Sequence, residues 1–340
     1  MNILLIQLKR IGDLVLTTPA IAAVREKFPD AKLTVAVSRG CQQLLPAIAG
    51  IDRAVALGGL VREVPKWIGV AARPFEFCVD FTHNDRSAFV TFLSAAKQRI
   101  SARHVELQSK IRAKSYNQLV DCKLRRLHTI DTHLALLEPL GIHNAPPQIR
   151  LALPEASLTQ AADLLRLHGV TGEYLLVHPG SARAEKFWEP DRWAAVIDHA
   201  AAELQLPCVL TGAATAEEQG HVAAIKADAR APIIDLSGRT DLLVLAALVE
   251  RARLLVTVDS APMHFAAAFG TPEIALFGPT NPFHWRPRLH SAMILQGDSA
   301  VPVSEFVPKQ PRAEMSLIST QAVIDAMESL LSASTAPRYE

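Results

Sequence analysis

The sequence predicts an α/β protein made of two domains, each built on a parallel sheet. Short apolar runs of strand length alternate with helical patterns along most of the chain, which is typical of strands joined by crossover helices. The chain has 340 residues, more than one hydrophobic core usually serves, and two domains fit that length. Gly141 and the pair Pro146-Pro147 interrupt the alternation, and we expect a linker there.

The first domain is expected at 1–150. Its opening residues are apolar and lack the basic leader and small-residue cleavage site of a signal peptide, so they predict a first strand. Strands are expected at 2–7, 32–37, 53–57, 76–80 and 97–101. Helices are expected at 14–28, 41–49, 61–72, 86–95 and 130–141.

The second domain is expected at 151–318, followed at 319–340 by a helix that packs back on the first domain and ends in a frayed tail. Strands are expected at 173–177, 207–211, 232–235, 254–258 and 273–277. Helices are expected at 190–204, 215–228, 241–250, 262–269 and 319–333. No apolar run reaches the roughly 18–20 residues that a membrane-spanning helix needs.

Composition narrows the class of protein. Apolar residues make up 49% of the chain and charged residues 20%, which excludes a disordered chain. The four cysteines are scattered and form no C-x-x-C pair, which argues against a zinc site and predicts reduced thiols in a cytoplasmic protein. They are Cys41, Cys78, Cys122 and Cys208.

The net charge of +1 conceals a strong asymmetry. Residues 1–150 hold 21 Lys and Arg against 12 Asp and Glu, whereas the remainder holds 14 against 22. The basic excess is concentrated in 97–126, which predicts an anionic partner such as a phosphorylated sugar, an anionic lipid or a nucleic acid. Nucleic acid is the weakest of the three, because Tyr116 is the only aromatic residue in that block. A plainly solvated surface is the alternative.

Two successive strands of the second domain end on small and polar residues. Asp259-Ser260-Ala261 follows the strand 254–258 and leads into an Ala-rich helix, and Gly278-Pro279-Thr280 follows the strand 273–277. Open α/β sheets bind ligands at this carboxyl edge, and a helix amino terminus can hold a phosphate. The pattern therefore predicts a nucleotide diphosphate in the second domain.

Other strand ends of this domain carry candidate ligands. His178-Pro179-Gly180-Ser181 follows a strand, and Lys186 could offset the charge of a diphosphate, although a lone loop lysine is usually only solvated. Either Glu217 or Glu218 could accept hydrogen bonds from a ribose, or the two could merely form a charged first helical turn. His264 has no second ligand at metal-binding spacing, so we expect no metal site.

The first predicted turn reads Gln7-Leu8-Lys9-Arg10-Ile11-Gly12-Asp13-Leu14. This is not G-x-G-x-x-G, so a dinucleotide-binding site loses its main support. Asp13 stands where a helix begins and could simply cap it. A carboxylate at the carboxyl edge of a strand could equally act as a general base.

Together these motifs resemble the lipopolysaccharide heptosyltransferases of glycosyltransferase family 9, over about residues 10–285. The order and spacing of the set carry the resemblance, since each motif alone is weak. The motifs are Arg10-x-Gly12-Asp13, Leu16-Thr17-Thr18-Pro19, His178-Pro179-Gly180-Ser181, Lys186-x-Trp188, Leu236-Ser237-Gly238-Arg239-Thr240, Asp259-Ser-x-Pro-Met-His264 and Phe277-Gly278-Pro279-Thr280.

The resemblance implies a GT-B fold, with two Rossmann-like, doubly wound domains and an interdomain cleft. It implies a metal-independent, inverting glycosyltransferase with no cofactor, which moves heptose from ADP-L-glycero-D-manno-heptose to the inner core of lipopolysaccharide or lipooligosaccharide. An acceptor at the inner leaflet implies peripheral contact with the cytoplasmic face of the inner membrane. We also expect a cytoplasmic monomer with no nucleic-acid partner.

The resemblance also assigns residues. Asp13 would be the catalytic base, and the nucleotide sugar would contact Ser181, Lys186, Glu218, Asp259, Ser260, Ala261 and His264. The basic excess suits an anionic acceptor, and the acceptor candidates are Lys9, Arg10, Arg99, Arg103, Arg112 and Lys114. The chain departs from the family at Ala261, where the family usually has glycine. An added methyl group is costly if the backbone there has positive φ or approaches the diphosphate closely.

Alternatives stay open at this point. The nearest is a GT-B transferase with another nucleotide sugar, for instance a UDP-hexose. A sugar-nucleotide epimerase would need neither a basic acceptor surface nor a base in the first loop. A non-catalytic glycan- or nucleotide-binding protein is the alternative of a different class, and only Ala261 favours it.

Overall fold

The computed structural model describes residues 1–58, 69 and 73–333. The chain divides after Ala152 into two compact units, each treated by itself below. The helix expected at 61–72 lies outside the described residues, Gly69 excepted.

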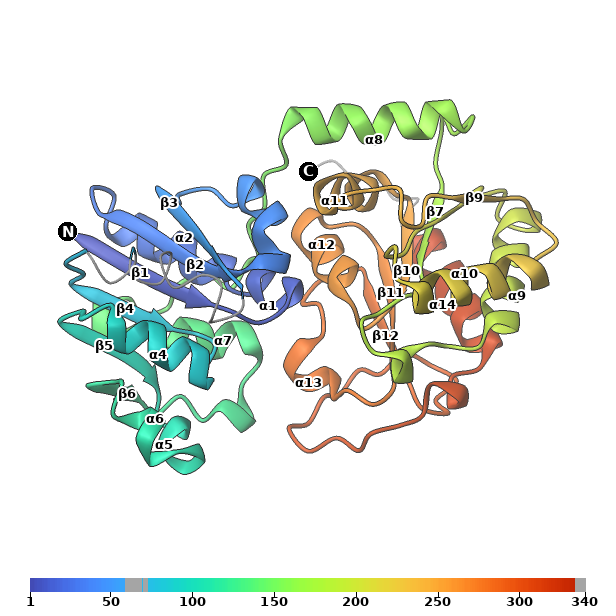
Figure 1. Cartoon of the computed structure of the whole chain (residues 1–340). Coiled ribbons are helices and arrows are strands. Elements are labelled where there is room, and N and C mark those ends of the chain that lie inside the picture. Colours follow the sequence, from blue (N-terminus) through green and yellow to red (C-terminus); the bar gives the residue numbers. More distant parts are fainter. Residues whose placement is uncertain (59–68, 70–72, 334–340) are drawn as a thin grey trace. The chain divides into compact units, whose positions relative to one another are not determined.

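The first unit contains a six-stranded parallel sheet in the order β3-β2-β1-β4-β5-β6 (Figure 1). The five strands expected from the sequence are all present, and a sixth, β6, follows them. The strands are β1 (Asn2–Gln7), β2 (Lys32–Ser38), β3 (Arg53–Leu57), β4 (Phe77–Asp80), β5 (Gln98–Ala102) and β6 (Gln118–Val120).

The helices of the first unit are shorter than expected. The single helix expected at 14–28 is two helices, because Pro19 lies in the first turn of a new helix whose N-cap is Thr17. The segment expected as a helix at 41–49 is a 3₁₀ helix with Pro46 inside it. The elements are α1 (Ile11–Val15), α2 (Thr18–Lys27), η1 (Arg39–Ala47), α4 (Asp85–Leu93), α5 (His104–Gln108), α6 (Lys110–Ala113), η3 (Leu124–Arg126), α7 (Thr129–Ala135) and η4 (Glu138–Leu140).

The second unit contains another six-stranded parallel sheet, in the order β12-β11-β10-β7-β8-β9. The five expected strands are present, and β12 is additional. The strands are β7 (Leu175–His178), β8 (Cys208–Leu210), β9 (Ile233–Asp235), β10 (Leu254–Val258), β11 (Glu273–Phe277) and β12 (Ala292–Gln296).

The expected helices of the second unit all form, and two further α-helices, α8 and α13, were not expected. The last helix, α14, contributes Val323 and Met327 to the core beneath this sheet. Met263 of α12 packs on the opposite face, against Phe277. The elements are α8 (Glu155–Leu167), η5 (Ala184–Lys186), α9 (Pro190–Ala202), α10 (Ala216–Asp228), α11 (Leu242–Arg251), α12 (Ala261–Phe269), α13 (Pro282–Trp285), η6 (Met315–Leu317) and α14 (Thr320–Ala333).

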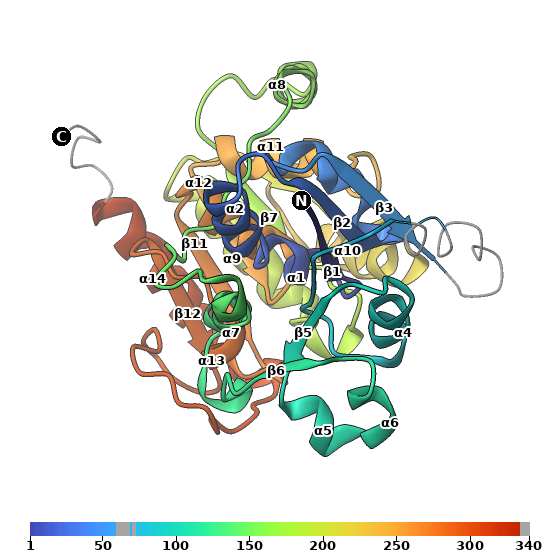
Figure 2. The same cartoon turned by 90° about the vertical axis from the view of Figure 1, so that its left-hand side faces the viewer.

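Each sheet has a point where the strand order reverses. In the first unit it lies between β1 and β4, and in the second between β7 and β10 (Figures 1 and 2). Loops at the carboxyl ends of such neighbouring strands form the usual ligand site of an open α/β sheet. The topology therefore gives one candidate position in each unit.

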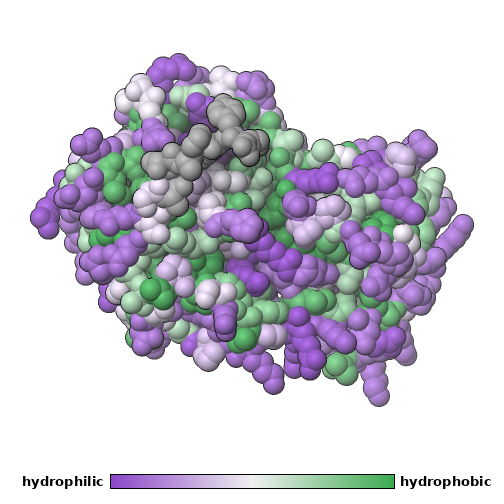
Figure 3. Space-filling view, turned by 180° about the vertical axis from the view of Figure 1, so that it is seen from behind, coloured by the Kyte–Doolittle hydropathy of each residue, from purple (hydrophilic) through white to green (hydrophobic). Residues whose placement is uncertain are grey.

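The surface is mixed in polarity. On the face shown in Figure 3, polar residues are spread among smaller apolar groups. No helix among the described residues is long and apolar enough to cross a membrane.

Candidate functional site

The donor candidates of the second unit gather at its switch point. Ser181 and Lys186 follow β7, whereas Asp259, Ser260 and Ala261 follow β10, the strand paired with β7. The hydrophobic strands before them are fully buried. The sheet thereby brings together residues that are more than 70 positions apart in the sequence.

Lys186 and Asp259 form a buried ion pair. The Lys186 ammonium donates to Asp259 Oδ2 at 2.6 Å and to the Asp259 backbone oxygen at 3.0 Å, and each side chain is 10% exposed. Buried charges are stable only when paired in this way. An ammonium has three N–H donors, so one of those on Lys186 is left for a ligand oxygen.

Helix α12 begins directly after this pair. Its N-cap, Ser260, makes no capping hydrogen bond, and its hydroxyl lies 3.1 Å from Thr257 Oγ1 instead. The first N–H groups of the helix are therefore not satisfied by the cap side chain. Ala261 is the first helical residue and is not among the described non-glycine residues with positive φ. The alanine thus causes no backbone strain.

Glu218 links the ends of β7 and β8. Its Oε2 accepts a hydrogen bond from the Ala213 N–H at 2.8 Å, and the side chain is 6% exposed. A Cβ atom on Gly180 would lie only 2.1 Å from the same Oε2. The glycine in the His178-Pro179-Gly180-Ser181 motif therefore makes room for the Glu218 carboxylate.

Two buried histidines lie near these groups. The pKa values of His178 and His264 are both lowered to about 4, chiefly by burial; for His264, Asp259 opposes the shift and Lys186 adds to it. His178 Nδ1 lies 3.0 Å from Thr211 Oγ1. No hydrogen-bond partner for His264 Nδ1 is found among the described residues. Both rings are neutral at pH 7, which suits hydrogen bonding rather than charge pairing.

Asp13 is the corresponding residue at the switch point of the first unit. Its Oδ2 accepts from the Arg10 N–H at 3.2 Å, so it does contribute to the start of α1. Its Oδ1 is buried and finds no hydrogen-bond partner within the described part of the chain. Burial raises the pKa of Asp13, with Lys9 opposing the shift. One oxygen therefore stabilises the helix, while the other has unused capacity to accept a hydrogen bond.

A hydrogen-bonded group that the sequence did not reveal supports the Asp13 loop. Thr17 Oγ1 donates to the Asp13 backbone oxygen at 2.7 Å and accepts from Gln7 Nε2 at 3.0 Å. His133 Nδ1 lies 3.2 Å from the same hydroxyl and 3.1 Å from the Leu16 oxygen. Burial lowers the pKa of His133 to about 3, so the ring stays neutral. The Leu16-Thr17-Thr18-Pro19 motif was the only signal available.

A second buried carboxylate was also missed. Asp80, at the end of β4, accepts from the Tyr116 hydroxyl at 2.6 Å and from the Thr82 N–H at 2.8 Å. Burial raises its pKa. Tyr116 is itself buried, so the single aromatic residue of the basic block is not available for base stacking.

The acceptor candidates differ in their surroundings. The Arg99 guanidinium donates to the Ser115 and Ala96 oxygens at 2.8 and 2.9 Å. The Arg112 guanidinium donates to Asp85 Oδ1 at 2.8 Å and to the His83 oxygen at 3.0 Å. Both arginines thus already stabilise the local fold. Lys9 is half-buried, and the exposed candidates are Arg10, Arg103 and Lys114.

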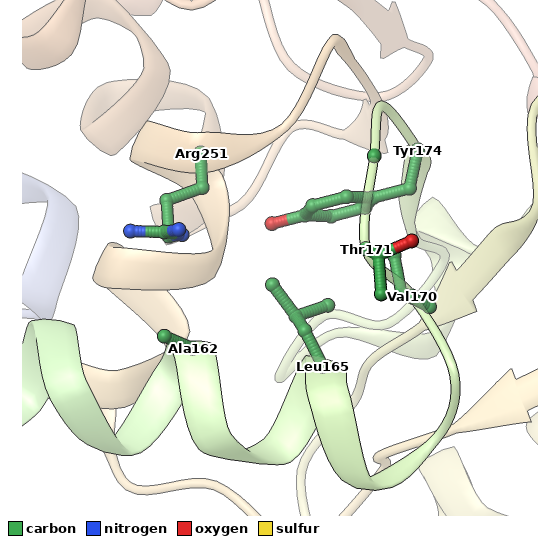
Figure 4. A pocket seen from close by; sticks show the side chains of 7 residues that line it. Ala162, Leu165, Val170, Thr171, Tyr174 and Arg251 are labelled. Atoms are coloured by element: carbon green, nitrogen blue, oxygen red, sulfur yellow. The ribbon is translucent and has the colours of Figure 1, made fainter.

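Among the described residues there are two other kinds of ligand site to compare, a metal site and the pocket shown in Figure 4, and neither is a better candidate than the switch points. Within the described residues, no three His, Cys, Asp or Glu side chains lie close enough to hold a metal ion. The pocket of about 330 Å³ in Figure 4 is lined by residues such as Leu165, Tyr174 and Arg251. Tyr174 precedes β7, so this pocket lies at the amino edge of the sheet, opposite the edge where such sheets bind ligands.

Two parallel sheets with polar side chains at their switch points define an α/β protein of the kind that binds nucleotide-type ligands. The chain belongs to glycosyltransferase family 9 (heptosyltransferase), whose family model matches residues 68–310. It is 30% identical to lipopolysaccharide heptosyltransferase 3 of Escherichia coli, over 95% of this chain and 97% of that protein.

Solved structures show the same fold. A family 9 glycosyltransferase from Veillonella parvula has a TM-score of 0.84 at 24% identity, with 98% of this chain and 97% of that chain covered. The E. coli heptosyltransferase with ADP-2-deoxy-2-fluoro heptose has a TM-score of 0.73 at 19% identity, over 97% and 99% of the two chains. The expected family and the expected α/β fold of GT-B type are thereby confirmed.

Proposed function

We propose that this protein transfers heptose from ADP-L-glycero-D-manno-heptose to the inner core of lipopolysaccharide. The observation that carries the proposal is the buried Lys186–Asp259 pair beside the amino terminus of α12, in a chain of the heptosyltransferase family. Relatives named lipopolysaccharide heptosyltransferase and a neighbour named with an ADP-heptose analogue support this donor and acceptor.

The second unit binds the donor in this proposal. Lys186, Ser181 and the amino end of α12 hold the diphosphate, and they offset the charge that builds on ADP without a metal ion. Glu218 accepts from the ribose, and Asp259 binds the heptose. Ser260, Ala261 and His264 contact phosphate or sugar.

The first unit binds the acceptor and supplies the base. Asp13 Oδ1 takes the proton of an acceptor hydroxyl, the hydroxyl oxygen bonds to the anomeric carbon, and the carbon–oxygen bond to ADP breaks. Attack opposite the leaving group inverts the anomeric centre. The raised pKa of Asp13 supports this role, because a base is most effective when its pKa approaches the working pH.

The location of the acceptor determines where in the cell the protein acts. Lys9, Arg10, Arg99, Arg103, Arg112 and Lys114 are the candidates for its carboxylates and phosphates. We place the enzyme in the cytoplasm, as a monomer in peripheral contact with the inner membrane, where a lipid-anchored acceptor is presented. Attraction between these basic residues and anionic lipid would weaken as the salt concentration rises.

The test is transfer itself. Purified protein is incubated with ADP-heptose and with core acceptors truncated at defined sugars, and product is followed by mass spectrometry and ADP release. Heptose addition to one of these acceptors is expected, with the anomeric configuration opposite to that of the donor. Absence of transfer to every truncated core, with ADP still bound, would refute the proposal.

A transferase with another nucleotide sugar is the second candidate, and Ala261 favours it because the resembled family usually has glycine there. Thermal-shift measurements with ADP, UDP and GDP separate the two. We expect the largest rise in melting temperature with ADP. A larger rise with UDP or GDP would mean that the donor carries that nucleotide instead of ADP.

A further inference from the structure

Two exposed apolar side chains stand out at one end of the first unit. Leu107 of α5 is 84% exposed and Ile111 of α6 is 82% exposed, more than any other large apolar side chain among the described residues. The two short helices contact each other beside β6, and α6 also contacts α4 (Figures 1 and 2). Isolated exposed leucines are common, but these two residues lie only four positions apart on helices that contact each other, and we treat them as one small apolar projection.

The fold does not need these two side chains. The opposite side of α5 is fixed by Val105, which is fully buried against Ala88 and Tyr116. Helix α6 is held by Arg112, which bonds Asp85 at the start of α4. Leu107 and Ile111 are therefore presented outward by helices that are anchored through other residues.

The chain around Leu107 and Ile111 is rich in basic residues. Between 97 and 114 the chain has six Lys and Arg and a single acidic residue, Glu106. Lys110 and Lys114 are exposed and flank Ile111 on the two sides along the chain. Helix α4, which contacts α6, also has an exposed aromatic side chain, Phe92, which is 61% exposed. We call Leu107, Ile111, Lys110 and Lys114 the α5–α6 surface.

This combination fits a lipid bilayer better than a macromolecule. The central parts of protein interfaces are depleted of lysine, and binding of single-stranded nucleic acid relies on exposed aromatic rings, whereas Tyr116 is buried. Apolar side chains that enter the headgroup region, bordered by lysines that reach lipid phosphates, are typical of peripheral membrane binding.

We propose that the α5–α6 surface docks the protein on an anionic bilayer. Leu107 and Ile111 enter the headgroup boundary, and Lys110 and Lys114 pair with lipid phosphates. The inference rests on the membrane contact in the proposed function, but not on heptose transfer. It places the first unit, which carries Asp13, at the membrane surface.

Vesicle co-sedimentation tests the surface. The full chain is mixed with vesicles of phosphatidylcholine alone or of equal parts phosphatidylcholine and phosphatidylglycerol, with and without added salt. The double variant Leu107→Ser/Ile111→Ser is expected to lose roughly tenfold in partitioning to the anionic vesicles. Leu167→Ser is the matched control, because Leu167 is 78% exposed but lies in the second unit.

A charge variant tests the lysines separately. Lys110→Glu is expected to weaken binding to anionic vesicles severalfold and to reduce its salt dependence, because it removes one lipid contact and adds repulsion. Lys27→Glu is the matched control, since Lys27 is exposed on α2 of the same unit. Equal effects of the two changes would mean that net charge alone drives binding, which overturns the assigned surface.

The outcomes distinguish the inference from the proposals on which it rests. If the wild-type protein does not co-sediment with anionic vesicles, membrane contact is refuted altogether. Vesicle binding that the double variant retains would refute this surface but leave the contact standing. A double variant that changes molecular mass in light scattering would identify the surface as an interface between two copies. Thermal melting checks that each variant is folded, and transfer to a soluble acceptor reports on catalysis independently.

Discussion

Asp13 combines burial with an oxygen that no described group uses. Because burial raises its pKa, the ionised form that accepts a proton is lost at a higher pH than for an exposed aspartate. We expect kcat/KM to rise with pH through this raised pKa and then level off. Asp13→Asn keeps the shape but removes the basic oxygen, and we expect a loss of roughly 10²–10⁴-fold in rate. ADP release with donor and acceptor present measures both.

The control for Asp13 is donor binding. Asp13 lies in the first unit and the donor candidates in the second, so Asp13→Asn is expected to leave the ADP affinity measured by calorimetry nearly unchanged. An Asp13→Asn protein that transfers heptose at the wild-type rate would remove Asp13 as the base.

The Lys186–Asp259 pair predicts two effects of one substitution. Lys186→Met leaves Asp259 buried without its partner, which is expected to cost about 3–5 kcal/mol in the free energy of unfolding. It should also weaken ADP binding, because the remaining ammonium donor is lost. In Lys186→Met/Asp259→Asn much of the stability should return while ADP affinity stays low. If calorimetry gives wild-type ADP affinity for this folded double variant, Lys186 does not hold the diphosphate.

The sequence indicated individual site residues but not their partners. Ser181, Lys186 and Asp259 could be predicted because each follows an apolar strand, where the topology of a parallel sheet puts ligands. The Lys186–Asp259 bond could not, because nothing local couples residues so far apart. The same holds for Thr17 and His133, which are 116 positions apart and meet only in the folded first unit.

At the scale of elements, segments with a clear apolar periodicity were predicted, whereas elements and boundaries without a clear start or stop signal were not. Helix α8 was missed because its N-cap position is Pro154, which provides no side-chain acceptor as a start signal. Strand β12 is a short apolar run of five residues, and such runs do not distinguish strand from helix. The prediction of one continuous helix at 14–28 was wrong because Pro19 lies in the first turn of a second helix.

The loop after β7 predicts a specific effect of one methyl group. In Gly180→Ala the new Cβ would overlap Glu218 Oε2, so the carboxylate must move and its bond to the Ala213 N–H must break. We expect a lower melting temperature and, because Glu218 is the ribose candidate, weaker ADP binding. Both are measured by thermal shift with and without ADP.

Gly220 provides the matched control. It lies inside α10, and a Cβ there would meet no atom within 4 Å, so Gly220→Ala is expected to stabilise the protein by up to about 1 kcal/mol. In a Glu218→Ala background, Gly180→Ala should cost much less than in the wild type. An undiminished cost in that background would show that the overlap with Glu218 is not the cause.

At the scale of the whole molecule, buried titratable groups determine how stability depends on pH. His133, His178 and His264 have pKa values lowered by burial to about 3, 4 and 4, whereas an unfolded histidine has a pKa of about 6.5. Below pH 6.5 the unfolded chain binds protons that the native histidine rings do not bind, so the contribution of these histidines to stability falls on acidification. Above that pH these histidines contribute no slope. Buried carboxyl groups with a raised pKa act in the opposite direction, because the native state keeps protons that the unfolded chain has lost.

Glu273 is the clearest of these carboxyl groups. It is fully buried at the start of β11, no partner for either carboxyl oxygen occurs among the described residues, and burial raises its pKa well above the usual value. The native state then keeps a proton that the unfolded chain loses near pH 4.3, so Glu273 costs stability as pH rises, by about 1.4 kcal/mol per unit up to its native pKa. Glu273→Gln, which stays neutral, should remove this cost.

Urea unfolding between pH 5 and 9 measures the difference in stability between wild type and Glu273→Gln, in which the other titrating groups cancel because they are common to both proteins. The advantage of the variant should grow with pH and become constant once the native carboxyl ionises. Glu203→Gln, at an exposed position, should show no such growth. Parallel pH profiles for wild type and Glu273→Gln would mean that the carboxyl is solvated or paired in solution. The remaining pH dependence of stability would then come from other groups, such as Asp13 and Asp80, whose pKa values are also raised by burial.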